Sequence, residues 1–147
     1  MSKNKTKILE SCYHCNPNVE KVEYIRNKVE EETKARSKGK DDRFLFNLLE
    51  KNRVVGGCYG KRYFNSLHIY LVWVESDSRH LGYGRKLMGL VEKLALEKKC
   101  DFITLNTIVN ESANQFYLKL GYKKELERCG YTDKGRACFF IKKLTKG

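Results

Sequence analysis

Apolar residues recur along the chain at two spacings, one typical of helices and one typical of strands. From Val19 they return every three or four positions among Glu, Lys and Arg, which predicts an amphipathic helix to about residue 36. The same spacing predicts a second helix from Gly84 to about Lys98 and a third over about 111–119. Alternating or continuous apolar runs predict about seven strands, at 6–13, 43–50, 53–60, 66–75, 101–109, 122–129 and 136–144.

The order of these elements indicates an α/β fold with a mixed, mostly antiparallel central sheet and flanking helices. Strands 43–50, 53–60 and 66–75 are separated by short polar segments, so we expect an antiparallel meander. A helix lies between strands 66–75 and 101–109, and a strand–helix–strand connection of this kind is right-handed and joins parallel strands. We therefore expect these two strands to be parallel neighbours within a single domain that spans 1–147.

Composition agrees with one folded domain. The chain has 147 residues, of which 41% are hydrophobic, and a chain of this length usually forms one domain. No apolar stretch approaches the roughly 20 residues that a membrane helix needs. The start of the chain, Met1 to Lys7, does not lead into the apolar core of a signal peptide. We therefore expect a cytoplasmic protein without a membrane partner.

The chain is strongly basic. Its 30 Lys and Arg residues outnumber its 18 Asp and Glu residues, which gives a formal charge of +12. Such a charge raises the local concentration of anionic partners. Nucleic acid, an acidic protein and a phosphorylated cofactor all fit this description, so the charge alone does not choose among them.

Six cysteines in a chain without an export signal are expected to stay reduced and to form no disulfides. Cys58, Cys100 and Cys138 lie among apolar residues and are expected in the core. Cys12 and Cys15 form a CxxC pair, but a structural zinc site needs four ligands and no second pair follows at finger spacing. We expect no metal, and the role of the Cys12/Cys15 pair stays open.

The segment Val74–Gly84 has the features of a phosphate-binding loop. Its RxxGxG sequence, which begins at Arg79, stands directly between a predicted strand and a predicted helix. Glycines let the backbone approach a ligand, and the amide groups at a helix N-terminus attract anions, so this loop can hold a pyrophosphate. Arg85 and Lys86 add positive charge at the same point.

The residues after Gly84 exclude two other kinds of phosphate-binding loop. A dinucleotide fingerprint GxGxxG requires a third glycine where Leu87 stands. A P-loop that begins at Gly84 requires Lys and then Ser or Thr, where Leu90 and Val91 stand. The remaining alternative is a glycine-rich turn that only caps the helix.

The sequence at this point resembles the GNAT superfamily of acetyl-CoA-dependent N-acetyltransferases. The segment 74–84 is similar to the family's V(x4)[Q/R]xxGxG loop, and NESANQFYLKLGY at 110–122 is similar to its NxxAxxxYxxxG[F/Y] pattern. The likeness covers most of the chain. GGCYG at 56–60 and LVWV at 71–74 look more narrowly like a branch of small bacterial acetyltransferases whose acceptors are uncharacterised.

The resemblance implies a GNAT-like fold, acetyl-CoA as co-substrate, no metal, and transfer of the acetyl group to a primary amine. It also implies that backbone amides from Arg79 to the helix start hold the CoA pyrophosphate. Strands 66–75 and 101–109 are then expected to splay apart around the pantetheine arm. The residues expected at the cofactor are Trp73, Val74, Arg79, His80, Leu81, Gly82, Tyr83, Gly84, Arg85, Lys86, Asn106, Asn110, Ala113 and Tyr117.

The resemblance places Tyr117 at the position of the family's general acid. A phenol stays protonated at neutral pH and can donate to the departing thiolate; alternatively, Tyr117 is a core tyrosine. Strand alternation puts His68 and Tyr70, the candidate bases, on one face with Val72. His68 titrates in the useful range, whereas close relatives often carry a glutamate where Tyr70 stands. Glu75 is a third candidate base, but it is expected to be too near the loop and solvated. A water relay is also open.

A binding module on the same fold is the alternative to an enzyme. It would hold acyl-CoA or nucleic acid without turnover, although Lys61–Phe64 is the single cluster of basic and aromatic residues that suits nucleic acid. The acceptor cannot be identified from the segments expected to form its pocket, about 19–42 and 130–135. The positive charge weighs against polyamines or lysine-rich tails, since like charges repel. A homodimer is possible, as in similar proteins.

Overall fold

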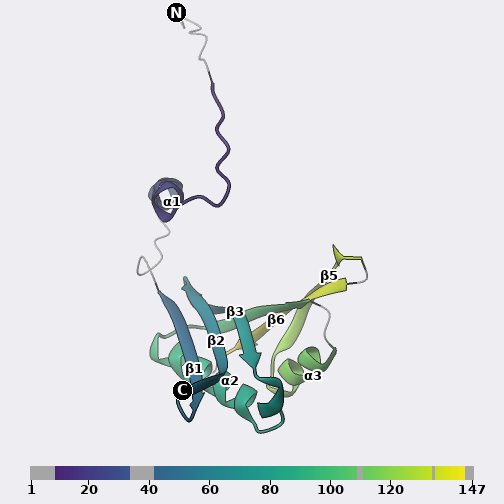
Figure 1. Cartoon of the computed structure of the whole chain (residues 1–147). Helices are drawn as coiled ribbons and strands as arrows, with labels where there is room; N and C mark the ends of the chain where they lie inside the picture. The colour runs from purple at the N-terminus through teal and green to yellow at the C-terminus, as the bar shows by residue number, and fades with distance from the viewer. Residues whose placement is uncertain (1–8, 34–41, 109–110, 134, 145–147) are drawn as a thin grey trace, which may run out of the picture. The chain divides into compact units, whose positions relative to one another are not determined.

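The computed structural model describes residues 9–33, 42–108, 111–133 and 135–144. The chain divides into two compact units, Met1–Arg36 and Ser37–Gly147. The first unit contains the helix α1, and the second contains the sheet with the helices α2 and α3 (Figure 1). The expectation of one domain over 1–147 stays a prediction.

The helix of the first unit, α1, spans Val19–Thr33. The predicted helix is therefore confirmed as far as Thr33, and its last positions, 34–36, lie outside the described residues. The side chain of Asn18 accepts a hydrogen bond from the backbone N–H of Lys21 at 3.1 Å. This bond satisfies one of the free amide groups that every helix start leaves open.

The strand predicted at 6–13 is wrong over its described part, because residues 9–13 have no regular structure. Leu9 and Tyr13 are 92% and 87% exposed. A strand persists only when its backbone groups pair with a neighbour, and no described strand pairs with this segment. The spacing of apolar residues predicted a strand here, but such spacing does not show whether a neighbouring strand is available for pairing.

The second unit is built on one mixed sheet whose strands follow the order β1-β2-β3-β4-β6-β5 (Figure 1). β3 and β4 are parallel, as predicted, and every other neighbouring pair is antiparallel. The described residues therefore form six strands rather than about seven. Their bounds are Arg43–Glu50 for β1, Arg53–Tyr63 for β2, Ser66–Val74 for β3, Phe102–Ile108 for β4, Lys123–Thr132 for β5 and Gly135–Lys143 for β6.

Two helices, α2 (Tyr83–Glu97) and α3 (Glu111–Lys119), cover one face of this sheet (Figure 1). Leu87, Val91 and Ala95 of α2 are fully buried against alternate strand residues. No helix among the described residues has the length and apolar character needed to cross a membrane. The core residues include Cys58, Cys100 and Cys138, as predicted.

A β-bulge interrupts the regular alternation of β3. Tyr59 of β2 pairs with Leu71, but the next residue, Gly60, pairs with Ile69, so Tyr70 has no partner on β2. One extra residue reverses which side chains face the core beyond that point. Val72 therefore packs against the core, and the prediction that it shares a face with His68 and Tyr70 is wrong.

The parallel strands β3 and β4 separate along their length. Their pairing begins at Ser66 and Phe102 and stops at Ile69 and Leu105. Both strands continue beyond that point, β3 to Val74 and β4 to Ile108. The expected divergence of the two strands is thus present, and it leaves backbone groups at the end of β3 unpaired with β4.

Candidate active site

A pocket of about 470 Å³ lies beside the end of β3 that does not pair with β4. This volume falls within the range of small-molecule sites, about 300–1,000 Å³. Its walls come from β3, the following loop, the start of α2 and one face of α3. The lining residues are Val72, Trp73, Val74, Ser78, Arg79, His80, Gly82, Tyr83, Gly84, Arg85, Ser112, Ala113, Phe116 and Tyr117.

The loop between β3 and α2 leaves the start of α2 open to a ligand. Gly82 stands before the helix with φ at +83° and, as a glycine, has no side chain to cap the first turn. A Cβ at Gly82 would have no atom within 4 Å, so the space beside it is open. Free amide groups at a helix start bind anions. His80 also has a positive φ, +67°, which a residue other than glycine adopts at a cost in strain.

Gly84 has a packing role that the sequence motif did not reveal. A Cβ at Gly84 would lie 3.1 Å from Cζ of Phe116 on α3. This distance is too short for comfortable contact, so the glycine lets α2 approach α3. A substitution at this position therefore disturbs the pocket wall as well as any ligand at the loop.

Positive side chains flank the same opening. Arg79 lines the pocket, and its Nε donates a hydrogen bond to the carbonyl of Val74 at 3.1 Å. Arg85 also lines the pocket and is exposed. An anion at the helix start would meet both guanidinium groups, which bind phosphate oxygens well.

Most of the predicted cofactor residues meet at this pocket, but three of the described ones do not. Leu81 and Lys86 are exposed beside it, and Asn106 is exposed on β4 without lining it. Asn110 lies outside the described residues. The sequence analysis missed Val72, Ser78, Ser112 and Phe116. The spacing of Ala113, Phe116 and Tyr117 on one helix face would have indicated Phe116, whereas Val72 depends on the bulge.

Tyr117 is both a core residue and part of the pocket wall. It is 7% exposed, and its ring packs edge-on against Phe116 and Tyr122 at centroid distances of 5.2 and 5.8 Å. Burial raises the pKa of Tyr117 to about 12. The hydroxyl is therefore protonated at neutral pH, as a proton donor must be.

The two candidate bases lie on the face of the sheet opposite α2 and α3. His68 is half-buried, and its Nδ1 lies 2.7 Å from the hydroxyl oxygen of Thr104 on β4. Its ring packs edge-on against Tyr70 at 4.8 Å. Burial lowers the pKa of His68, which favours the neutral imidazole needed by a base. Tyr70 is 54% exposed.

Glu75 is not simply solvated, which corrects the expectation for this residue. One of its carboxylate oxygens bonds to Arg53 at 2.9 Å, and the other is buried without a hydrogen-bond partner among the residues that the structure describes. The ion pair joins the start of β2 to the end of β3. Glu75 does not line the pocket.

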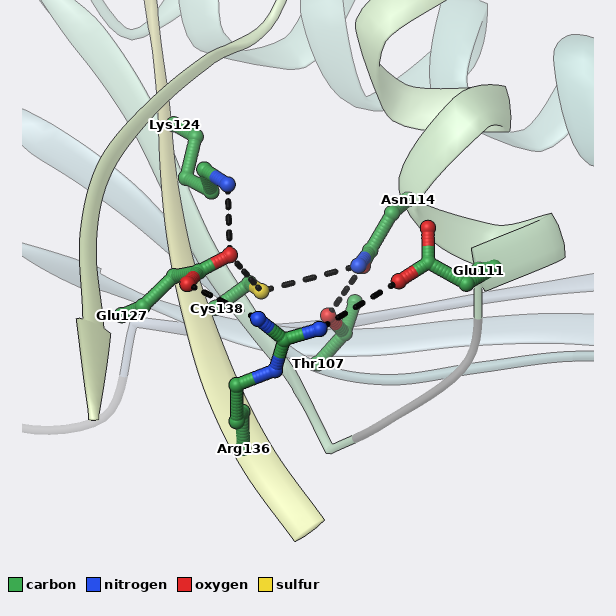
Figure 2. Close-up of polar contacts among 7 residues, drawn as sticks. All are labelled: Thr107, Glu111, Asn114, Lys124, Glu127, Arg136 and Cys138. Carbon is green, nitrogen blue, oxygen red and sulfur yellow. Dashed lines mark hydrogen bonds and ion pairs between the residues drawn. The ribbon is translucent and has the colours of Figure 1, made fainter. Parts of the chain in front are cut away.

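A polar network fastens α3 to the sheet (Figure 2). Thr107 of β4 donates a hydrogen bond to Asn114 of α3 at 2.6 Å, and the amide group of Asn114 contacts Sγ of Cys138 at 3.5 Å. Glu127 of β5 in turn accepts hydrogen bonds from Cys138 and Lys124, at 3.7 and 2.5 Å. The buried amide is thereby satisfied, which holds the pocket-lining face of α3 in place.

No group of three or more His, Cys, Asp or Glu side chains suited to a metal occurs among the described residues. Cys12 and Cys15 are exposed free thiols. The expectation of a metal-free protein stays a prediction.

A sequence model of the acetyltransferase (GNAT) family matches residues 6–122. The chain therefore belongs to this family, as its two motifs indicated. Among curated proteins, no sequence is similar enough to count as a match.

Solved structures have the same fold. An acetyltransferase from Bacillus cereus is 29% identical with a TM-score of 0.73, and the match covers 90% of this chain and 98% of that one. The ribosomal-protein-S18-alanine N-acetyltransferase from Escherichia coli is 17% identical with a TM-score of 0.67, over 91% and 82% of the two chains. An aminoglycoside 6′-N-acetyltransferase complexed with coenzyme A is 18% identical with a TM-score of 0.67, over 82% and 80%.

Proposed function

We propose that this chain transfers the acetyl group of acetyl-CoA to a primary amine. The observation that supports this proposal most directly is the pocket itself, which joins a helix start behind a glycine N-cap and two arginines to the end of β3 that does not pair with β4. This combination suits a ligand with a pyrophosphate at one end and an amide-containing arm at the other. The family of the chain supports the same chemistry.

The residues of the loop would bind the phosphates of acetyl-CoA. The free amides at the start of α2 and the guanidinium of Arg85 attract the pyrophosphate. The backbone of Trp73 and Val74 pairs with β2 but not with β4, so the side of β3 that faces β4 offers hydrogen bonds to the pantetheine arm, much as a neighbouring strand would. Ala113 and Phe116 of α3 close the opposite side of the pocket.

When bound, acetyl-CoA supplies a thioester carbon, at which a C–N bond to the amine forms while the C–S bond breaks. Tyr117 donates a proton to the departing sulfur, since it lines the pocket and its hydroxyl is protonated at neutral pH. His68 accepts the proton that the amine loses, either directly or through a water. The hydrogen bond with Thr104 fixes the imidazole, and burial keeps it neutral.

The binding part of this proposal is tested by calorimetric titration with acetyl-CoA. Arg85→Glu should weaken acetyl-CoA binding about tenfold or more, because a carboxylate replaces a cation beside the phosphates. Lys93→Glu is the matched control: it makes the same change of charge on the same helix, at an exposed position that does not line the pocket. Equal affinities for the two variants would contradict the site.

The catalytic part is tested by release of free CoA across a panel of amines, peptides and aminoglycosides. We expect release that depends on an amine and that saturates with acetyl-CoA. Tight binding of acetyl-CoA without amine-dependent release would favour the non-catalytic binding module instead.

A further inference from the structure

Four side chains form a compact cluster on the face of the sheet opposite α2 and α3. Tyr59 and Lys61 are alternate residues of β2, and His68 and Tyr70 belong to β3. The rings of Tyr59 and Tyr70 lie 5.9 Å apart, and those of His68 and Tyr70 lie 4.8 Å apart. Lys61 is the direct cross-strand partner of His68. In an antiparallel pair such partners have Cβ atoms about 4.5–5.5 Å apart, on one face.

The charged side chains of β1 to β4 on this face are all basic. Among the described residues of β1 to β4 that alternate onto this face, Arg43 and Lys61 are the permanently charged ones, and none is acidic. Lys61 is half-buried and makes no ion pair within the described part of the chain. A half-buried ammonium group without a counter-charge attracts an anionic ligand.

We propose that the acceptor is a small amino acid whose carboxylate is bound by Lys61. The inference rests on the proposed function, since it concerns the amine side of the same transfer. An amino acid carries its amine and carboxylate on one carbon, so the two groups fit a base and a cation on facing positions of neighbouring strands. The ammonium of Lys61 binds the carboxylate, and the imidazole of His68 receives the proton of the amine.

The aromatic part of the cluster holds the body of the acceptor. Tyr59 and Tyr70 present ring surface beside His68, and Tyr70 is 54% exposed. Aromatic faces bind apolar or planar side chains. Lys61 is a specificity-determining residue in this arrangement and takes no part in the transfer of the proton or the acetyl group.

The experiment compares amino acids with their primary amides: phenylalanine with phenylalaninamide, serine with serinamide, and alanine with alaninamide. Each amide keeps the amine and the side chain but loses the negative charge. The readout is kcat/KM from CoA release at saturating acetyl-CoA. The wild type should prefer the acid in at least one pair by about tenfold or more, the strength of a charge-assisted hydrogen bond.

Variants assign that preference to Lys61. Lys61→Gln should abolish the preference by raising KM for the acid, and Lys61→Arg should retain it. Lys123→Gln is the matched control, because this exposed lysine of β5 should leave the preference unchanged. Equal use of acid and amide by the wild type, a preference for the amides, or a preference that survives in Lys61→Gln overturns the inference.

Failure of this inference is distinguishable from failure of the proposed function. Transfer to amides or other amines, without transfer to the acids, overturns the role of Lys61 and leaves the acetyltransferase intact. Acetyl-CoA binding without transfer to any member of the panel also overturns the inference. Absence of acetyl-CoA binding in calorimetry contradicts the proposed function itself.

Discussion

Two buried tyrosines, Tyr117 and Tyr122, pack edge-on with ring centroids 5.8 Å apart, but only Tyr117 lines the pocket. Tyr122 is 2% exposed, and its hydroxyl has no hydrogen-bond partner among the described residues. Burial raises the pKa of both side chains. The two side chains therefore have similar environments, but only Tyr117 can contact a ligand in the pocket. Tyr122 can thus serve as the control for substitutions of Tyr117.

Tyr117→Phe should lower kcat by roughly 100-fold, because loss of a general acid typically costs 10²–10⁴-fold. The affinity for acetyl-CoA should change little, since the ring that forms the pocket wall is kept. Tyr122→Phe should retain full activity. It should also leave stability unchanged or raise it by about 1 kcal/mol, because it removes an unsatisfied buried hydroxyl. Steady-state kinetics and thermal unfolding measure the two effects, and a Tyr117→Phe variant with wild-type turnover would exclude the acid role.

His68 gives a pH-dependent prediction. Burial lowers its pKa below the ordinary value of about 6.5. A protonated imidazole cannot accept the proton of the amine, so kcat/KM should fall as the pH drops through this lowered pKa. In His68→Gln the acid limb of the profile should disappear together with most of the activity. An acid limb that is unaltered in His68→Gln would assign the base to another group.

At the scale of elements, the sequence predicted most of the fold because each strand and helix carries its own spacing. The helix after Gly84 and the strands from Arg43 to Val74 were located to within a residue or a few. The predicted strand at 6–13 failed over its described residues, because pairing is a property of two segments. The bulge at Tyr70 was missed for a related reason: one extra residue in a ladder is visible only in the register of its partner.

The candidate site divides in the same way. Most residues within one contiguous motif, such as Arg79, Gly82 and Arg85, line the pocket as predicted, because the loop and helix start are local structures. Phe116 was missed although it belongs to the second motif, since its position against Gly84 results from the packing of α3 on α2. Ser78 was missed because it is buried in a short 3-10 turn, Ser76–Ser78, which the pattern of apolar residues does not predict.

Alanine substitutions at two glycines of α2, Gly84 and Gly89, distinguish the effect of helix propensity from the effect of the contact between α2 and Phe116. Gly89 has open space where a Cβ would be, whereas a Cβ at Gly84 would lie 3.1 Å from Phe116. Gly89→Ala should raise the free energy of unfolding by about 0.5–1 kcal/mol, because alanine favours a helix interior. Gly84→Ala should be less stable than Gly89→Ala by roughly 1 kcal/mol and should bind acetyl-CoA more weakly, because Phe116 must move. Denaturant unfolding and calorimetry measure both, and equal stabilisation by the two substitutions would contradict the close contact.

At the scale of the whole molecule, the formal charge of +12 acts on encounter rather than on chemistry. Exposed charges steer an anionic ligand over distances up to about a Debye length, near 10 Å at 0.1 M salt. Acetyl-CoA carries several phosphate charges, so the positive surface should increase its association rate. The same charge would also increase binding of nucleic acid, so charge dependence must be measured with ligands that differ in phosphate alone.

S-acetylpantetheine provides this comparison, because it keeps the thioester and the arm but has no phosphate. Between about 20 and 200 mM salt, the association rate of acetyl-CoA should fall severalfold, since screening shortens the reach of the surface charge. The association rate of S-acetylpantetheine should stay nearly constant. Stopped-flow binding measures both rates. Equal salt sensitivity of the two association rates would show that salt acts on the pocket or the fold rather than on the phosphates. Displacement of acetyl-CoA by a short DNA duplex at about 150 mM salt would indicate instead that the positive surface binds nucleic acid.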